Sequence, residues 1–401
     1  MMKHIKQVLV SFMITLVAVC GIGFNQLPVV HAATVDAHAA FAVDAQTGQV
    51  LYNHNGDQRL AVASMSKLLT VAVIENEINS GKLKWSTKVK ITPAEAKLST
   101  ASGYSNVPLK AGKKYTVKQL TQAALIKSGD AATIALTRAQ GRNTQQFVQQ
   151  MGTMAKRIGL SNYRLYNGVG LENGDMASFK LPKTAGTAEN QMTARDVAKV
   201  ARYLIRNYPA LLKITQQRTL RWDGKDYPNS NELLPGNEAA PKKVQVDGLK
   251  TGTSDKAGQC LVSTGTYQGH RIITVVMHAN NRFSQTKALY EEVFANWQPV
   301  TGKQWQTVSV SHGQQKKVQL TTKHAVTVWQ PQHQPVKAQF IADAHVKDGQ
   351  KIKAPLKKNT RVGKLQYRKL TNLNNQPLQF GVYPTNEVKR AGLFGWLDNL
   401  F

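Results

Sequence analysis

The sequence is poor in cysteine. Only Cys20 and Cys260 occur in 401 residues, and Cys20 lies within an apolar N-terminal run. A chain cut after that run keeps one cysteine, which excludes an intrachain disulfide. The cysteines and the ten histidines show no metal-ligand spacing, so we expect no structural zinc site and no other metal or cofactor.

Acidic residues are also scarce. Lysine and arginine number 52 against 23 aspartates and glutamates, which gives a formal net charge of +29. Such a balance attracts polyanions, and nucleic acid is one of them. The N-terminus predicts export, however, so we expect no nucleic-acid partner. An anionic membrane or an anionic cell-wall polymer fits an exported protein better.

The export prediction rests on the first 32 residues. Lys3 and Lys6 precede an apolar run from Val8 to Phe24, and the small-residue cleavage pattern Val30-His31-Ala32 follows. This arrangement is typical of a secretory signal peptide. A retained membrane span is the alternative. Lipidation at Cys20 is disfavoured by the valine that precedes it.

The next part of the chain predicts an α+β domain. A hairpin is indicated over 38–53, and a helix that is apolar on nearly all sides over 64–78. Amphipathic helices with Thr or Asn caps are predicted at 116–127, 143–159 and 193–207. Three strand-like runs follow from Lys242, and then a helix over 285–297. We expect an antiparallel sheet in which the first hairpin pairs with the last strands.

The composition changes after Trp297. Residues 303–386 hold short alternating runs with no helical pattern, which predicts a separate, small all-β sandwich. The last fourteen residues, VKRAGLFGWLDNLF, place their large apolar side chains within an arc of about 160° on a helix. Such a helix lies in a membrane interface, or else docks on its own protein. The predicted divisions are 1–32, 33–298, 299–386 and 387–401.

The stretch ASMSK contains the first chemical motif. No Gly-x-Ser-x-Gly motif is present, so a histidine-activated serine of that kind is not indicated. Ser64 and Lys67 share one face at the start of the apolar helix. A desolvated lysine loses its proton more easily and can serve as base for the serine. A second Ser-x-x-Lys, at Ser284–Lys287, is interpreted as chance.

The stretch DGLKTGTS contains the second motif. Lys250, Thr251, Gly252 and Thr253 lie at a predicted strand, and this Lys-Thr-Gly occurs once in the chain. Charge, hydroxyl and a glycine that permits close approach suit an extended peptide ending in a carboxylate. The Thr253 N–H could help to bind an oxyanion. A polar strand end is the alternative interpretation.

The stretch LIKSGDAAT interrupts an apolar, helix-forming region with Ser128, Gly129 and Asp130. The triplet could carry chemistry, or Asp130 could cap the helix that follows. The local sequence leaves both open.

The ordered set Ser64-x-x-Lys67, Ser128-x-Asp130, Lys250-Thr251-Gly252 resembles that of the low-molecular-weight penicillin-binding proteins, the D-alanyl-D-alanine carboxypeptidases. The segments LYNGVGL and KTGTSDKAGQCLVSTG also look like family landmarks, and the resemblance covers almost all of the chain after the signal. It implies a penicillin-binding/β-lactamase-like transpeptidase domain at 33–298, followed by a β domain and a membrane anchor.

The resemblance also implies an activity. A serine-type enzyme would remove the terminal D-alanine from peptidoglycan stem peptides that end in D-Ala-D-Ala, and β-lactams would inhibit it. We expect it at the outer face of the bacterial cytoplasmic membrane or in the cell wall, held by the C-terminal helix.

Residue roles follow from the same resemblance. Ser64 would attack the penultimate carbonyl, Lys67 would take its proton, and Ser128 would pass a proton to the leaving amine. The backbone N–H groups of Ser64 and Thr253 would form the oxyanion hole. The terminal carboxylate would be held by Lys250, Thr251 and Arg282.

Two positions depart from the family pattern. Val62 stands near where a proline is usual, which affects only local rigidity. Asp130 stands where the family usually has asparagine, and a carboxylate can only accept hydrogen bonds. Bound to Lys67, it would raise the lysine pKa and weaken the base. Two alternative functions stay open: a β-lactamase, which the motifs permit, and a non-catalytic wall-binding protein with a decayed site, which Asp130 alone favours.

Overall fold

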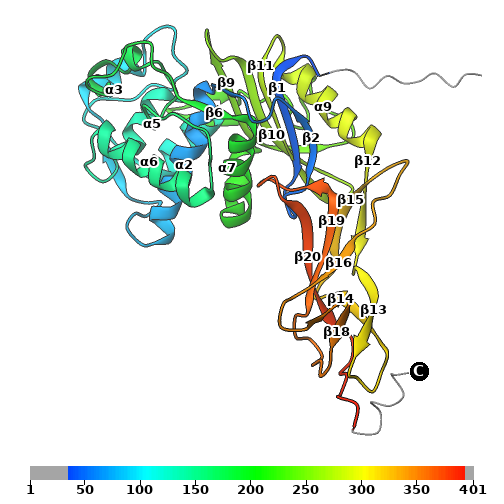
Figure 1. The fold of residues 1–401 in the computed structure, drawn as a ribbon. Helices are drawn as coiled ribbons and strands as arrows, with labels where there is room; N and C mark the ends of the chain where they lie inside the picture. Colours follow the sequence, from blue (N-terminus) through cyan, green and yellow to red (C-terminus); the bar gives the residue numbers. More distant parts are fainter. Residues whose placement is uncertain (1–34, 393–401) are drawn as a thin grey trace, which may run out of the picture. The chain divides into compact units, whose positions relative to one another are not determined.

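A computed structural model of the chain describes residues 35–392. Its central sheet has five strands in the order β2-β1-β11-β10-β9, with antiparallel neighbours throughout (Figure 1). The strands are β1 (Ala37–Asp44), β2 (Val50–His54), β9 (Gln245–Ser254), β10 (Gly258–Tyr267) and β11 (His270–Ala279). The predicted pairing of the first hairpin with the last strands is confirmed, because β1 pairs with β11.

The two faces of this sheet are covered by different helices. Alternate residues of β1 point to opposite faces, so Phe41 and Val43 join the core that includes α7 (Ala194–Asn207), whereas Ala42 joins the core beneath α9 (Arg282–Asn296). In Figure 1 these two helices flank the sheet. Strands buried on both faces explain the long apolar runs in this part of the sequence.

The larger core also contains residues from five further helices. They are α2 (Ser66–Asn79), α3 (Pro93–Leu98), α4 (Val117–Ile126), α5 (Asp130–Thr137) and α6 (Thr144–Ile158). Thr116, Asn143 and Thr193 cap α4, α6 and α7 through their side chains, as predicted. The shorter elements are η1 (Ala63–Met65), β3 (Arg59–Ala61), β4 (Lys88–Lys90), β5 (Lys114–Thr116), η2 (Asn173–Phe179), β6 (Gln191–Thr193), η3 (Pro209–Leu211), α8 (Leu212–Thr215), β7 (Thr219–Trp222) and β8 (Lys225–Pro228).

The predicted helix over 64–78 begins differently from the expectation. Its first turn is the 3₁₀ helix η1, and α2 starts only at Ser66. Ala63 has a positive φ of 43°, so the chain enters η1 through a left-handed residue. As expected for a central helix, α2 is buried on most sides: 11 of its 14 residues are buried.

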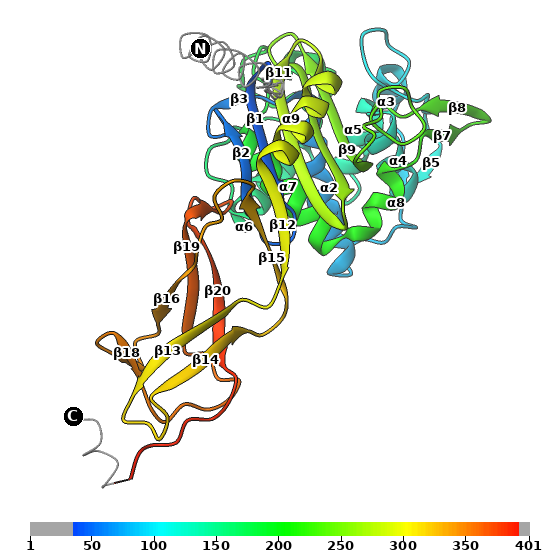
Figure 2. The same cartoon turned by 90° about the vertical axis from the view of Figure 1, so that its right-hand side faces the viewer.

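The segment after α9 is β-rich, as predicted, and no helix occurs between residues 297 and 392 (Figure 2). β12 (Trp297–Gly302) pairs with β15 (Val326–Pro331), and a seven-stranded sheet has the order β16-β19-β20-β14-β13-β18-β17. Its strands are β13 (Trp305–Ser311), β14 (Lys317–Thr322), β16 (Gln339–Ala342), β17 (Lys347–Asp348), β18 (Lys351–Lys353), β19 (Gly363–Thr371) and β20 (Pro377–Pro384).

Trp329 of β15 packs in the core beneath α9. The Gln49 side chain accepts from the Trp329 N–H at 2.9 Å and donates to its carbonyl at 2.7 Å. The indole N–H donates to Asp44 Oδ2 at 3.0 Å. These contacts join the end of β1 to β15.

The prediction of a helix over 387–401 is wrong for its first part. Val388 forms a β-bridge with Leu356, and Arg390 forms one with Gly313. The Val388 N–H donates to the Leu356 carbonyl at 2.9 Å, so backbone groups that a helix would need are already paired. Residues 393–401 and the predicted signal at 1–32 lie outside the described residues. No helix within 35–392 is long and apolar enough to cross a membrane.

Candidate active site

Ser64 and Lys67 meet at the junction of η1 and α2. The Lys67 ammonium donates to Ser64 Oγ at 2.6 Å, as the spacing of three residues predicts. Lys67 is fully buried. Burial lowers its pKa below the ordinary lysine range because the charged form loses its hydration, while the neighbouring Asp130 carboxylate opposes that shift. A lysine in this position can accept a proton from the serine.

Ser128 lies in the break between α4 and α5. Its φ is +63°, a left-handed conformation that few non-glycine residues adopt. The next N–H, that of Gly129, donates back to the Ala123 carbonyl at 2.9 Å and closes the turn. Lys67 Nζ lies 3.4 Å from Ser128 Oγ. The helix break thus brings a second hydroxyl to the same buried amine.

Asp130 binds Lys67 and does not cap a helix. Its Oδ1 lies 2.8 Å from Lys67 Nζ, and its Oδ2 accepts from the Ser105 N–H at 3.0 Å. The N-cap of α5 is Gly129, without a side-chain cap, and Asn106 accepts from the Ala131 N–H at 2.9 Å instead. The cap interpretation of Asp130 is therefore wrong, because its carboxylate is fully used by an ammonium and a loop N–H.

The strand β9 brings Lys250 and Thr251 to the site. Lys250 is buried, and its ammonium donates to the Thr251 carbonyl at 3.0 Å. Desolvation lowers its pKa well below the ordinary value, and the positive charge of Lys67 lowers it further. The Thr251 hydroxyl donates to Ser230 Oγ at 3.0 Å. The Lys250 amine and the Thr251 hydroxyl are thus held at the edge strand, where both can donate to an anionic ligand.

Gly252 lets β9 approach η1. A Cβ atom at this position would lie 2.8 Å from the Val62 carbonyl oxygen and 3.4 Å from the Met65 nitrogen, both backbone atoms. Only glycine therefore permits this approach of the strand to the turn that carries Ser64. Gly170, in LYNGVGL, serves the same turn: its φ is 91°, and a Cβ would lie 1.9 Å from the Ala63 carbonyl oxygen.

Arg282 reaches the open end of β9 from the first turn of α9. It donates to the Gly252 carbonyl at 2.8 Å and to Thr253 Oγ1 at 2.5 Å. Burial lowers its pKa from the ordinary arginine value. The predicted residues therefore form two groups. Hydrogen bonds of Lys67 join the first group, which is Ser64, Lys67, Ser128 and Asp130. The second group is Lys250, Thr251, Gly252 and Thr253 on β9, together with Arg282, which contacts the end of that strand.

Comparison with known proteins decides the family. Residues 27–281 match the family model of D-alanyl-D-alanine carboxypeptidase, and residues 300–390 match that of the penicillin-binding protein 5 C-terminal domain. The chain belongs to the D-alanyl-D-alanine carboxypeptidase family. It is a serine-type D-Ala-D-Ala carboxypeptidase that acts on peptidoglycan, with a C-terminal β-rich domain of the penicillin-binding protein 5 type.

Relatives are similar over most of their length. The carboxypeptidase DacF of Bacillus subtilis is 29% identical over 90% of this chain and 88% of its own, and DacC of Escherichia coli is 29% identical over 91% and 88%. Among solved structures, a peptidoglycan synthesis regulatory factor, PBP3, of Streptococcus pneumoniae has a TM-score of 0.74 at 28% identity, over 88% of this chain and 99% of that one.

Three contacts of the carboxypeptidase were not predicted from its sequence. Ser230 accepts from Thr251, the Ser105 backbone binds Asp130, and Glu189 accepts from Ser254 Oγ at 2.7 Å. Burial raises the pKa of the Glu189 carboxyl. These residues come from loops distant in sequence, and no local pattern identifies them. Only the glycines of LYNGVGL indicate, from sequence, a loop that packs closely on η1, the turn that carries Ser64.

The remaining sequence observations also have structural outcomes. The Val62 N–H donates to the Asn190 carbonyl at 3.1 Å, a bond that a proline at this position could not make. Ser284 of the second Ser-x-x-Lys is exposed on α9, and its hydroxyl donates to the Asn281 carbonyl at 3.2 Å. Among residues 35–392, no group of three or more His, Cys, Asp or Glu side chains is placed to hold a metal ion.

Proposed function

We propose that Ser64 is the nucleophile of this carboxypeptidase and that Lys67 is its general base. One observation carries the proposal: Lys67 Nζ lies 2.6 Å from Ser64 Oγ in a site where the lysine is fully buried. The distance lies within the range at which a base can abstract a proton. Burial lowers the pKa of the lysine, and this increases the fraction of neutral amine at neutral pH.

In the proposed acylation, Ser64 Oγ forms a bond to the carbonyl carbon of the penultimate D-alanine. The C–N bond to the terminal D-alanine breaks. The serine proton passes to Lys67, and Ser128 delivers a proton to the leaving amine. The 3.4 Å separation of Lys67 Nζ and Ser128 Oγ supports this relay. Water then cleaves the Ser64 ester and releases the shortened stem peptide.

The developing oxyanion is proposed to bind the backbone N–H groups of Ser64 and Thr253. Ser64 lies in the first turn of η1, where N–H groups have no partner within the helix. Thr253 lies on β9, which is the edge strand of its sheet and can therefore pair with an extended peptide. Lys250, Thr251 and Arg282 would hold the terminal carboxylate, and Gly252 and Asp130 would shape the binding site.

β-Lactam antibiotics are the proposed inhibitors. Penicillin-binding protein D2 of Listeria monocytogenes, 26% identical over 64% of this chain, has been solved in cefotaxime-bound and ampicillin-bound forms. A β-lactam carries an amide carbonyl and a carboxylate, the two groups for which Ser64 and β9 are proposed to be arranged.

The test is labelling with a fluorescent penicillin together with D-alanine release from diacyl-Lys-D-Ala-D-Ala. Ser64→Ala should abolish labelling and reduce release by at least about a thousandfold. Ser284→Ala is the matched control, because it removes the serine of the other Ser-x-x-Lys, and it should retain both activities. Labelling of Ser64→Ala at the wild-type level would disprove the nucleophile. Rapid turnover of penicillin by the wild type would favour the β-lactamase alternative.

We propose further that residues 1–32 direct export, that 33–298 and 299–386 are separate domains, and that the C-terminal segment anchors the enzyme at the outer face of the cytoplasmic membrane. The two lysines before an apolar run support the first part. The amphipathic pattern beginning at Leu393 supports the last. A chain ending at Gly392 should move from the membrane to the soluble fraction of fractionated cells, and unchanged partition would refute the anchor.

A further inference from the structure

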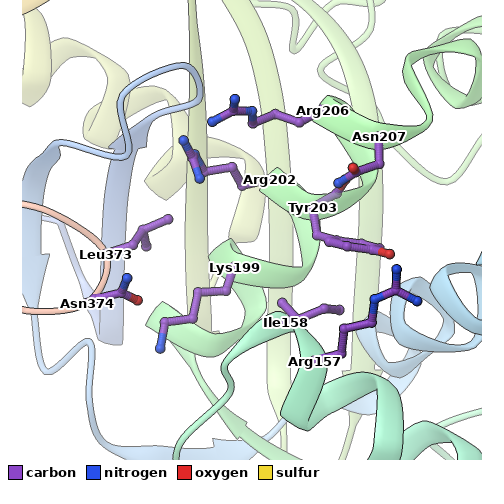
Figure 3. Close-up of a pocket in the computed structure, with 9 residues that line it drawn as sticks. All are labelled: Arg157, Ile158, Lys199, Arg202, Tyr203, Arg206, Asn207, Leu373 and Asn374. Carbon is purple, nitrogen blue, oxygen red and sulfur yellow. The ribbon is translucent and has the colours of Figure 1, made fainter. Parts of the chain in front are cut away.

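A cavity of about 380 Å³ lies away from Ser64 and is lined by cations (Figure 3). Its walls come from the end of α6, one face of α7 and the turn after β19. The charged lining residues are Arg157, Lys199, Arg202 and Arg206. Figure 3 shows the last three extending from α7 toward the side where Leu373 and Asn374 lie. The established activity uses none of these side chains.

The cations of α7 lie on one face of the helix. Lys199, Arg202 and Arg206 are spaced by three and four residues, so their side chains are neighbours, and like charges at this spacing destabilise a helix. Arg206 lowers the pKa of Arg202 by repulsion, in addition to the larger effect of burial. A folded protein that keeps such a cluster has an unfavourable charge distribution that an anion would relieve.

Neutral carbonyl groups orient these guanidinium groups. Arg202 donates to the Ala45 carbonyl at 2.9 Å and to the Gln46 carbonyl at 2.7 Å, and Arg206 donates to the same Gln46 carbonyl at 3.1 Å. Within residues 35–392, neither arginine pairs with a carboxylate. Their orientation is thus fixed by neutral groups. Their charge is only partly offset, by the Asp44 carboxylate, which raises the pKa of Arg202 against the larger effect of burial. This is the arrangement of a preorganised anion site.

The other two cations are only weakly neutralised. Arg157 donates to the amide oxygen of Asn76 at 2.5 Å. Lys199 donates to the Gly159 carbonyl at 2.8 Å and lies 3.6 Å from Asp196, whose carboxylate also accepts from two backbone N–H groups. The cavity therefore has four cations and two nearby carboxylates, those of Asp196 and Asp44.

We infer that this cavity binds a polyanion with repeated phosphate groups, a phosphodiester-linked polymer of the wall in which the enzyme is proposed to work. The span supports a chain over a single ion: from Lys199 to Arg206 the helix rises roughly 10 Å. Guanidinium groups bind phosphate oxygens with two parallel hydrogen bonds, which suits Arg202 and Arg206, the two arginines of α7 that line the cavity. Occupancy would hold the carboxypeptidase on the polymer without touching Ser64.

The experiment is titration of the full chain with oligo(glycerol phosphate) at several salt concentrations. Arg157→Gln/Arg206→Gln should weaken binding by about tenfold or more and reduce the salt slope by about one per cation removed. Lys88→Gln/Lys90→Gln is the matched control: both lysines are exposed on β4, and binding should stay within about twofold. D-alanine release from diacyl-Lys-D-Ala-D-Ala should be unchanged in both variants, which also shows that they fold.

Two further arms distinguish the source of the phosphate. Inorganic phosphate should bind far more weakly than the oligomer, and equal affinity would overturn the polymer assignment. Phosphatidylglycerol vesicles test a lipid headgroup: if the arginine variant loses vesicle binding but keeps oligomer binding, the inference is wrong. Equal weakening by both double variants would also overturn it, since binding would then follow net charge alone. None of these outcomes depends on whether Ser64 is the nucleophile.

Discussion

The carboxylate of Asp130 lies 2.8 Å from the ammonium of Lys67, and both side chains are almost fully removed from solvent. The pair places an acid where the family usually has an amide. The pKa of Lys67 is therefore subject to two opposite effects: burial lowers it, and the Asp130 carboxylate raises it. Burial is the larger influence, so the departure from the family pattern does not by itself indicate a decayed site.

Asp130→Asn should lower the pKa of Lys67 further, because it removes the charge that stabilises the ammonium form. The amide oxygen can still accept from the Ser105 N–H. The neutral base then persists to lower pH, so the acidic limb of the pH profile of kcat/KM should move to lower pH. Asp226→Asn, at an exposed carboxylate, is the control and should leave the limb in place. A shift to higher pH, or none, contradicts the proposed role of Lys67.

Gly252→Ala should separate β9 from the nucleophile turn. The added Cβ would lie 2.8 Å from the Val62 carbonyl oxygen, so backbone must move. We expect a loss of about 1–3 kcal/mol in the free energy of unfolding and at least about tenfold slower acylation by penicillin. Gly302→Ala on β12 is the matched control, because nothing lies within 4 Å of its added Cβ. Normal acylation by Gly252→Ala would show that the close approach is not required.

Arg282→Gln tests the proposed carboxylate contact. Removal of the guanidinium should raise KM for diacyl-Lys-D-Ala-D-Ala by about tenfold or more, which corresponds to about 1.4 kcal/mol, with a smaller effect on kcat. Arg282→Lys keeps the charge and loses the planar fork, so it should lie between the wild type and the glutamine variant. A fall in kcat at constant KM would instead indicate that Arg282 only supports the strand end, through Gly252 and Thr253.

Glu75 on α2 predicts a pH dependence of stability. Burial raises its pKa from 4.5 to about 7, so the folded chain binds a proton in a range where the unfolded chain has released it. Stability should therefore fall as pH rises from about 4.5 to about 7. Glu75→Gln should be more stable than the wild type at pH 8 by on the order of 1–2 kcal/mol, after allowance for solvent screening, and should lose that advantage near pH 4.

Chemical denaturation at the two pH values measures this difference. Glu238→Gln, at an exposed glutamate, is the control and should show no pH-dependent gain. An advantage of Glu75→Gln that is the same at both pH values would mean that side-chain packing, and not ionisation, is responsible.

Sequence patterns predicted most of the catalytic part of the fold because its elements are marked locally. The last three strands of the central sheet have alternating or continuous apolar residues between turn residues. Three helices are marked by their N-cap residues, Thr116, Asn143 and Thr193. Ser64 and Lys67 were found for the same reason, since a spacing of three residues fixes their contact once the helix exists. The remaining candidate site residues were predicted through the family resemblance, which the order of the three motifs along the chain indicated.

What the sequence did not predict depends on distant backbone. Ser105 and Glu189 reach the site from loops whose conformation no periodicity encodes. Aspartate is a common N-cap residue, so a cap was one interpretation of Asp130. The buried Lys67 ammonium is a stronger hydrogen-bond partner for its carboxylate than a helix N–H. The prediction of a helix from residue 387 was wrong because Val388 forms a β-bridge with Leu356. A helical wheel considers only the segment itself and cannot predict a contact with a distant strand.

The contact between Gln49 and Trp329 limits how this chain can be divided. The Trp329 indole fills part of the core beneath α9. The backbone N–H and carbonyl of Trp329 both form hydrogen bonds with the Gln49 side chain, in the first hairpin. A fragment ending before β12 would leave an opening about the size of a tryptophan. The Gln49 side chain would lose both of its hydrogen bonds to Trp329, and Asp44 Oδ2 would lose the indole N–H. Shortened forms of the enzyme should therefore aggregate unless Asp44 and Gln49 are replaced by smaller side chains that need no hydrogen bond to Trp329.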